Sequence, residues 1–357
     1  MKEKFIAVDS GKYNTKVAYF DEESNISKTL AFRTKTGIGY FEDDGLEKDS
    51  YIVEIDGKVY KIGNGACTEA ELETSKKSDI HKTCILSAIA MCCYKETEEV
   101  EVNVAIGIPI SDYNEVPKRN AFREFIFDKE SYSVKIKASA TSTPKEIKFK
   151  IKNKYVFPES AGALFVDTND TIDLNGSVGV LDLGNLNNNL VVYRAGEQDK
   201  EMSLTNELGG NILINGLARK LSTEFSRVDY KTTMDILNQP ANERCLPIAD
   251  EALQAKSNAI IHEYLLEHCN KIKRDLDTKG WSFDYMTFIG IGGTASVLSE
   301  ELSELFGDRI FIPKQPEFAN VVGFLRMCYA KAGKEDKLIP MPTKMQIEES
   351  EILPEAV

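Results

Sequence analysis

Apolar positions recur along the chain with two different periods. Alternation every second residue, or a short run of Val, Ile, Phe and Tyr, predicts β-strands, whereas apolar positions spaced three and four residues apart predict helices. Strands are expected at residues 4–8, 16–20, 51–55, 58–63, 100–109, 132–139, 144–157, 178–183, 188–193, 286–291 and 310–313. Helices are expected at residues 79–94, 117–127, 211–225, 249–277, 294–302 and 318–333. Because strands and helices mix throughout, with antiparallel hairpins opening each half, the fold class is α/β.

Two of the expected hairpins, at residues 6–20 and 178–193, share one plan: an apolar strand, an Asp-x-Gly turn and a second strand. Aligned position by position, they pair Asp9 with Asp182, Gly11 with Gly184 and Asn14 with Asn187. The N–H groups of such a turn point into one concavity that suits phosphate oxygens, and the carboxylate suits a hydrated Mg²⁺ ion. A duplicated fold would place both turns on one ligand. The alternative is that they are two unrelated β-turns.

A third glycine element, "FIGIGGTAS", places Gly292 and Gly293 after a buried strand and before a helix. A glycine turn in this context lets the backbone approach a flat or anionic ligand closely. The chain contains neither a G-x-G-x-x-G fingerprint at this point nor a G-x-x-x-x-G-K-[ST] loop anywhere. If a nucleotide binds, it binds by a scheme other than the Rossmann or P-loop arrangement.

Composition narrows the class of protein further. A net charge of −13 argues against direct contact with nucleic acid, which requires Lys and Arg to neutralise phosphates. The start of the chain, "MKEKFIAVDSG", lacks the apolar region of a signal peptide, and no stretch approaches the ~20 apolar residues of a membrane span. The cysteines include no C-x-x-C pair, which favours buried free thiols over metal ligands or disulfides. We therefore expect a soluble, cytoplasmic, acidic protein.

Taken in order, these elements resemble the actin fold of actin, bacterial actins, heat-shock chaperone ATPases and sugar kinases. The first phosphate loop of that superfamily ends a strand with Asp-x-Gly and has a Lys seven residues after the Asp, as Asp9, Gly11 and Lys16 do. The second phosphate loop of the superfamily resembles the segment with Asp182 and Gly184. Its adenosine loop resembles the segment with Gly292, Gly293 and Thr294, and its crossover segment resembles residues 157–163. The resemblance covers about residues 4–332. It implies an actin-like, duplicated ribonuclease H-like fold with two lobes around a nucleotide cleft.

The order of the motifs is most similar to the ParM-type plasmid-segregation actins of the divergent Gram-positive kind. This resemblance implies that Glu159 and Asp182 are catalytic, with Glu159 positioning the attacking water, and that Asp9 and Asp182 hold Mg²⁺ through water. The implied nucleotide-binding residues are Asp9, Ser10, Gly11, Lys12, Asn14, Lys16, Gly184, Asn185, Asn187, Gly209, Gly210, Gly292, Gly293 and Thr294. The implied cofactors are ATP or GTP and Mg²⁺. For Glu159 the alternative is an exposed surface carboxylate after Pro158.

Two departures from the family pattern stand out. The second loop lacks the usual hydroxyl residues and second Asp, and instead carries asparagines at 185, 187, 188 and 189. Amide side chains donate to phosphate oxygens, so phosphate binding is retained, but metal geometry and hydrolysis rate are open. In the first loop, Lys12 stands where the family often has a small hydroxyl residue, and an added cation favours a triphosphate.

The function implied by the resemblance is a filament-forming NTPase that polymerises with bound ATP or GTP, hydrolyses it and drives plasmid DNA segregation. Its expected partners are copies of itself and a ParR-type DNA-binding adaptor, without direct contact to nucleic acid or membrane. A small-molecule kinase and a chaperone-like ATPase of the same superfamily are the alternatives. A kinase requires an acceptor site with a catalytic base, and a chaperone requires a substrate-binding domain.

On the same resemblance the chain divides into lobe I at residues 1–160, with a small subdomain at about 32–79, and lobe II at residues 161–309. A helix returning to lobe I is expected at 310–335 and a polar tail at 336–357. The choice between ATP and GTP, the geometry of a filament, the identity of the adaptor and the roles of the acidic loop and the tail leave no readable signal.

Overall fold

The structure is a computed structural model that describes residues 2–334 except 22–25, 71–74, 167–171 and 174. The predicted polar tail at 336–357 lies outside the described residues. The chain divides into two compact units. The first unit comprises residues 1–166 and 320–357, and the second unit comprises residues 167–319. Within the described part of the chain, no helix is both long and apolar enough to cross a membrane.

The described strands of the first unit are β1 (Glu3–Ser10), β2 (Asn14–Asp21), β3 (Ile26–Arg33), β4 (Lys35–Ile38), β5 (Ser50–Ile55), β6 (Lys58–Gly63), β7 (Thr68–Glu69), β8 (Val100–Ile108), β9 (Ser131–Lys137) and β10 (Lys145–Pro158). They form one sheet in the order β3-β2-β1-β8-β10-β9-β5-β6-β4-β7. The helices described in this unit are α1 (Asp79–Cys92), α2 (Ile110–Tyr113), α3 (Val116–Ile126), the short 3₁₀ helix η1 (Ala161–Phe165) and, from its second residue on, α9 (Ala319–Lys331).

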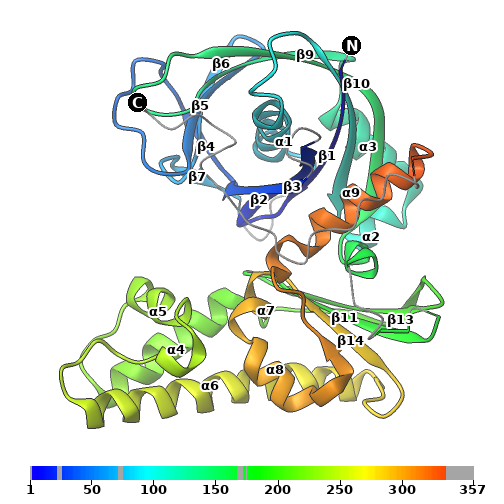
Figure 1. Ribbon diagram of the computed structural model, residues 1–357. Coiled ribbons are helices and arrows are strands. Elements are labelled where there is room, and N and C mark those ends of the chain that lie inside the picture. The colour runs from blue at the N-terminus through cyan, green and yellow to red at the C-terminus, as the bar shows by residue number, and fades with distance from the viewer. Residues whose placement is uncertain (1, 22–25, 71–74, 167–171, 174, 335–357) are drawn as a thin grey trace. The chain divides into compact units, whose positions relative to one another are not determined.

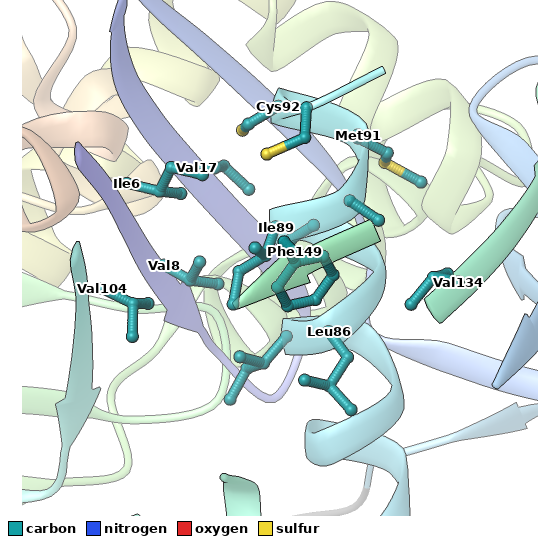
Figure 2. Close-up of a cluster of buried hydrophobic side chains, with 14 of the residues drawn as sticks. Ile6, Val8, Val17, Leu86, Ile89, Met91, Cys92, Val104, Val134 and Phe149 are labelled. Atoms are coloured by element: carbon teal, nitrogen blue, oxygen red, sulfur yellow. The ribbon is translucent and has the colours of Figure 1, made fainter. Parts of the chain in front are cut away.

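Helix α1 forms the centre of the first unit. It contacts β1 and β2 near one end of the strand order and β4 and β9 towards the other, so the sheet curls around it (Figure 1). Its sequence is apolar on nearly every side, and only Asp79, Ile80 and Lys82 are not buried. Figure 2 shows Leu86 and Ile89 among the inward-facing residues of the strands, including Val8 and Phe149. Burying a helix on all sides requires this kind of composition.

Helix α9 covers the other face of the central strands. Alternate residues of a strand point to opposite faces, so Phe5 of β1 faces away from α1, and its ring stacks on Tyr329 of α9 at 4.1 Å between centroids. Phe324 of α9 packs against Phe157 at the end of β10. The central strands are therefore covered on both faces, as parallel neighbours in a sheet usually are.

The second unit has the described strands β11 (Ser177–Leu183), β12 (Asn188–Arg194), β13 (Glu197–Asn206), β14 (Thr287–Ile291) and β15 (Ile310–Phe311). Its helices are α4 (Gly210–Glu224), α5 (Tyr230–Leu237), α6 (Glu251–Thr278), α7 (Gly293–Val297) and α8 (Ser299–Phe306), with 3₁₀ helices η2 (Ala241–Glu243), η3 (Gly307–Arg309) and η4 (Pro316–Phe318). The apolar stripe predicted on α6 lies in the core of this unit, where Leu265, Ile272 and Leu276 are buried completely.

The two sheets contain the same five-strand arrangement. The second unit has the order β13-β12-β11-β14-β15, and the first unit contains β3-β2-β1-β8-β10. In both, the first hairpin and its third strand are antiparallel, and the last two strands are parallel to the first strand of the hairpin. The Asp-x-Gly hairpins thus occupy equivalent positions in a duplicated sheet, and the alternative of two unrelated turns is wrong.

The sequence pattern missed four of the described strands, β3, β4, β7 and β13, and two of the described α-helices, α2 and α5. Strand β13 extends the second hairpin, but its residues are mostly polar and partly or fully exposed, as suits the edge of a sheet. Strand β3 extends the first hairpin in the same way and also lies at an edge. Helix α5 is only eight residues long, too short for a clear helical period. Among the cysteines, five are buried free thiols as expected, whereas Cys67 is exposed and Cys245 partly exposed.

Candidate functional site

The first hairpin brings together the acidic and basic residues that the sequence singled out at its start. Asp9 lies at the end of β1, is only 8% exposed, and stands opposite Lys16 of β2 in the antiparallel register. The N–H of Gly11 donates to the carbonyl oxygen of Asp9 at 3.1 Å, closing the turn. A Cβ on Gly11 would lie 2.8 Å from the carbonyl oxygen of Asn14, so the turn needs glycine there.

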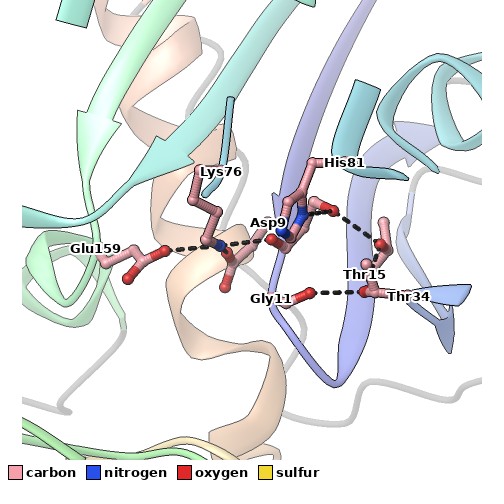
Figure 3. Close-up of polar contacts among 8 residues, drawn as sticks. Asp9, Gly11, Thr15, Thr34, Lys76, His81 and Glu159 are labelled. Carbon is pink, nitrogen blue, oxygen red and sulfur yellow. Dashed lines mark hydrogen bonds and ion pairs between the residues drawn. The ribbon is translucent and has the colours of Figure 1, made fainter. Parts of the chain in front are cut away.

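Lys76 joins this hairpin to the predicted catalytic carboxylate. Its Nζ lies 2.8 Å from Oε1 of Glu159 and 4.0 Å from Oδ1 of Asp9 (Figure 3). It also donates to the carbonyl oxygen of Ser10. The Lys76 side chain is only 7% exposed, so the two acids and the amine interact with little screening by water. No sequence signal pointed to Lys76, because it lies in the segment before α1 and belongs to no motif.

Glu159 is held by its backbone as well as by Lys76. Its N–H donates to the carbonyl oxygen of Ile108 at 2.8 Å, and its side chain is 14% exposed. The alternative of an exposed surface carboxylate is therefore wrong. The next residue, Ser160, is completely buried with a φ of 71°, a left-handed conformation that costs energy outside glycine. Such strain persists only where the surrounding packing enforces it.

A group of buried hydroxyls lies beneath the same turn. Oγ of Ser10 is 3.0 Å from Oγ1 of Thr15 and 3.0 Å from Nδ1 of His81. Oγ1 of Thr15 is 2.9 Å from Oγ1 of Thr34, which donates to the carbonyl oxygen of Gly11 at 2.6 Å. Figure 3 shows these groups side by side with Asp9 and Lys76. The sequence predicted a role only for Ser10 and Gly11 of this group.

Burial and two neighbouring amines keep His81 neutral. Burial lowers its pKa from 6.5 to about 3, and the positive charges of Lys76 and Lys12 act in the same direction. Lys12 therefore lies close enough to His81 for its positive charge to lower the pKa of the imidazole.

The second hairpin repeats the strand register of the first and the close approach of its glycine to an asparagine carbonyl. Asp182 lies at the corresponding point of β11, opposite Asn189 of β12, so Asn189 occupies the register position that Lys16 has in the first hairpin. The N–H of Gly184 donates to the carbonyl oxygen of Asn187 at 3.2 Å. A Cβ on Gly184 would lie 2.6 Å from that oxygen, as on Gly11 in the first turn.

The remaining predicted glycines pack onto this second turn. The carbonyl oxygen of Gly184 accepts from the N–H of Gly210 at 3.0 Å and from Oγ1 of Thr294 at 2.8 Å. A Cβ on Gly209 would lie 2.6 Å from the carbonyl oxygen of Asn185. These glycines are thus required by contacts within the chain, in addition to any contact with a ligand.

The first glycine of the glycine turn is equally close to the second hairpin. Gly292 has a φ of 93°, and a Cβ there would meet the carbonyl oxygen of Leu183 at 2.4 Å and Oδ1 of Asp182 at 3.1 Å. A Cβ on Gly293 would meet no atom within 4 Å. Gly293 therefore has open space where a side chain would lie, whereas Gly292 does not.

Sequence reasoning missed an amide network behind the second hairpin. Asn188 is completely buried, and its Nδ2 donates to Oδ1 of Asn206 at 3.0 Å and to the carbonyl oxygen of Leu208 at 2.8 Å. Asn206 in turn donates to Oδ2 of Asp275 at 2.7 Å, and Nε2 of His268 lies 3.0 Å from the carbonyl oxygen of Leu208. The network ties α6 to the loop that opens α4, and the run of asparagines was its signal in the sequence.

The predicted residues therefore form one cluster in each unit. Asp9, Lys16 and Glu159 belong to the first, and the structure adds Lys76 to it. Asp182 belongs to the second. Within the described residues, no group of three or more His, Cys, Asp or Glu side chains is arranged to bind a metal directly. The aspartate at each turn, Asp9 in the first cluster and Asp182 in the second, fits an ion held through its water shell, which is how Mg²⁺ is commonly bound.

Comparison with known proteins places this geometry in context. The family model for the N-terminal domain of actin-like proteins matches residues 7–162. The filament structure of Alp12 has a TM-score of 0.71 at 21% identity, covering 93% of this chain and 100% of that one. No curated protein sequence matches the chain.

Two further relatives have solved structures. The archaeal actin homologue Ta0583 has a TM-score of 0.73 at 18% identity, covering 92% of this chain and 99% of that one. Ta0583 has also been solved in complex with ADP, with a TM-score of 0.69 at 16% identity and the same coverage. The apo ParM protein of pSK41 has a TM-score of 0.71 at 16% identity, covering 94% of this chain and 100% of that one.

The expected resemblance and the expected α/β fold class are thus confirmed. The chain has the actin-like fold, and its residues 7–162 match the family model for the N-terminal domain of actin-like proteins.

Proposed function

We propose that the protein is a filament-forming actin-like NTPase that binds ATP or GTP with Mg²⁺, polymerises, and hydrolyses the bound nucleotide. The observation that carries this proposal is the shared contact of Lys76 with Glu159 and Asp9, directly behind an Asp-x-Gly turn. Phosphoryl transfer needs chiefly positioned charges and a positioned nucleophile, and this cluster supplies both kinds of group.

In the proposed reaction, different residues of the protein bind the phosphates, orient the water and fix the carboxylate. The backbone N–H groups of the first turn, with Lys12 and Lys16, bind phosphate oxygens. Glu159 orients the attacking water through its carboxylate, because a carboxylate within hydrogen-bond reach positions a water without being a strong base. Lys76 fixes that carboxylate and offsets its repulsion with Asp9.

The residues of the second unit complete the proposed nucleotide contacts. The turn amides at Gly184 and Asn185, with the side-chain amide of Asn187, donate to phosphate oxygens, and the glycines at 209, 210, 292 and 293 border the nucleoside. Asp9 and Asp182 would hold Mg²⁺ through its water shell, and the bound ion would neutralise charge on the phosphates.

Self-association and the biological role rest on the relatives. Alp12 forms a filament and Ta0583 binds ADP, while both share the fold of this chain. The similarity to ParM favours plasmid DNA segregation through a ParR-type adaptor as the role of the filament. The acidic charge of the chain fits an indirect link to DNA, because a net charge of −13 opposes contact with phosphates.

The test combines light scattering, pelleting and phosphate release at micromolar protein and Mg²⁺, with ATP, GTP, the diphosphates and no nucleotide. We expect assembly with one triphosphate above a critical concentration, followed by phosphate release. Hydrolysis without assembly would instead support a kinase or a chaperone-like ATPase. Absence of any nucleotide binding would overturn the proposal.

Glu159→Gln and Glu146→Gln are the matched variants. Glu146 lies on the same strand, β10, and its side chain is 55% exposed, so its loss should leave phosphate release unchanged. Glu159→Gln should assemble with nucleotide but release phosphate on the order of a hundredfold more slowly, because an amide orients water less well than a carboxylate. Equal phosphate release by both variants would remove Glu159 from the proposed role.

A further inference from the structure

The hydroxyls beneath the first turn form a continuous row that begins at a histidine and ends at the backbone (Figure 3). From Nδ1 of His81 the row passes through Ser10, Thr15 and Thr34 to the carbonyl oxygen of Gly11, with successive distances of 3.0, 3.0, 2.9 and 2.6 Å. The side chains of all four residues are buried or nearly so. Water therefore does not compete for these groups.

The carbonyl end of the row fixes the direction of every hydrogen bond in it. A carbonyl oxygen only accepts, so the single hydroxyl proton of Thr34 points at Gly11. The proton between Thr34 and Thr15 must then come from Thr15, and the proton between Thr15 and Ser10 must come from Ser10.

The same reasoning sets the tautomer of His81. Because the proton of Ser10 is already used, Nδ1 of His81 carries a proton and donates it to Ser10. His81 is neutral, so its Nε2 has no proton. That atom is buried and has no hydrogen-bond partner among the described residues. Leaving this buried nitrogen without a hydrogen bond costs energy, so the contact of Nδ1 with Ser10 must hold the ring in this tautomer.

The end of the row controls the geometry of the turn itself. Thr34 holds the turn on both sides of Lys12, since its hydroxyl donates to the carbonyl of Gly11 and its N–H donates to the carbonyl of Tyr13 at 2.9 Å. In a trans peptide the C=O and the N–H point in opposite directions. Fixing the Gly11 carbonyl toward Thr34 therefore directs the N–H of Lys12 to the opposite side of the turn.

We propose that His81 is a positioning residue for the first phosphate-binding turn, acting through a one-directional chain of hydroxyls that ends at the carbonyl of Gly11. This row of hydroxyls holds the turn in the form that presents the N–H of Lys12 to a phosphate. This inference rests on the proposed nucleotide-binding function for its purpose, but the direction of the chain does not depend on it.

The direction of the chain is tested without any ligand, by long-range ¹H–¹⁵N spectra of the histidine rings. The sequence has three histidines, so the spectrum is simple to assign. His81 should be protonated on Nδ1, whereas His268, whose Nε2 faces the carbonyl of Leu208, should be protonated on Nε2. In Thr34→Val the donor to Gly11 is lost, and His81 should become a mixture of tautomers while His268 stays unchanged. Protonation of His81 on Nε2 in the wild type would overturn the inference.

The effect on binding is tested with Mg²⁺–ATP and Mg²⁺–GTP by titration calorimetry. Thr34→Val and His81→Leu should each weaken binding roughly tenfold, the value of one buried hydrogen bond. Thr34→Ser and His81→Asn, which keep a donor in nearly the same place, should recover most of the affinity. His262→Leu is the matched control, because that histidine is 53% exposed on α6.

The two proposals fail in different ways. A wild type that binds nucleotide together with a Thr34→Val variant that binds equally well would overturn the positioning role and leave the proposed function intact. A wild type that binds neither nucleotide would overturn the proposed function and, with it, the proposed role of the hydroxyl row in phosphate binding. The tautomer spectrum would still decide whether the chain runs from His81 to Gly11.

Discussion

The hydroxyl of Thr294 donates to the carbonyl oxygen of Gly184 at 2.8 Å, across 110 residues of sequence. In the first unit the hydroxyl of Thr34 makes the corresponding contact with Gly11 at 2.6 Å. The duplicated turns therefore share a threonine anchor, but the threonine comes from the segment between β3 and β4 in one unit and from α7 in the other. The second turn lacks hydroxyls of its own, and α7 supplies one.

Thr294→Val should lower the free energy of unfolding by about 1 kcal/mol, because a hydrogen bond to a partly buried carbonyl is lost. Thr294→Ser should retain most of that stability. Denaturant unfolding of both variants measures the difference. Equal stability of the valine and serine variants would mean that the hydroxyl contributes nothing.

Lys76→Met should leave Glu159 and Asp9 close together without their shared cation. We expect a loss of about 3 kcal/mol in the free energy of unfolding, together with loss of phosphate release, because removing one partner of a buried ion pair is strongly destabilising. Lys77→Met is the matched control, since that neighbour is exposed. If the two variants unfold at the same denaturant concentration, the proposed role of Lys76 is wrong.

Gly323→Ala should disrupt the packing of α9 on the segment after Glu159. A Cβ on Gly323 would lie 2.0 Å from the carbonyl oxygen of Gly162, and backbone cannot move aside as a flexible side chain can. We expect a loss of about 2 kcal/mol or more from this overpacking. Gly45→Ala is the control, because its nearest neighbour would be 3.5 Å away. Thermal unfolding compares the two.

The free energy of unfolding should decrease as the pH is lowered below neutrality, because His81 is buried in its neutral form. Its pKa is about 3 in the folded state against 6.5 for an unperturbed histidine, so between these values the unfolded state binds a proton that the folded state does not. The free energy of unfolding should therefore decrease by about 1.4 kcal/mol per pH unit as pH falls through this window. His268, whose pKa is lowered mainly by burial, contributes with the same sign.

The contribution of His81 is separated from that of the carboxylates by the choice of pH. Glu3, paired with Lys152 and Lys334, has a pKa lowered from 4.5 to about 2, so its contribution is lost only below its unfolded value. Denaturant unfolding between about pH 6 and pH 5 should show a smaller slope for His81→Asn than for the wild type. An unchanged slope would contradict the assignment.

The sequence predicted the parts of the fold that depend on local pattern. The paired hairpins at Asp9 and Asp182 were visible because each motif lies within about fifteen residues, and the long helix α6 because its apolar stripe repeats over many turns. Edge strands such as β13 carry no such pattern, since one side and one edge face water.

The parts of the site that were missed come from distant segments. Lys76 reaches Glu159, which lies 83 positions later in the sequence, and His81 reaches Ser10 from a helix whose other side chains mostly belong to the core. Neither residue belongs to a spacing that chemistry would single out. Only the folding of the sheet around α1 brings them beneath the first turn.

The return of α9 to the first unit has a consequence for synthesis on the ribosome. The second unit is one continuous insertion, residues 167–319, and α9 emerges only after it. At ~5–20 residues per second, roughly 10–30 s pass between completion of β10 and the arrival of the helix that covers it. During that interval Phe5 and Phe157 remain uncovered on the nascent sheet, so this surface of the first unit is prone to aggregation until α9 has been synthesised.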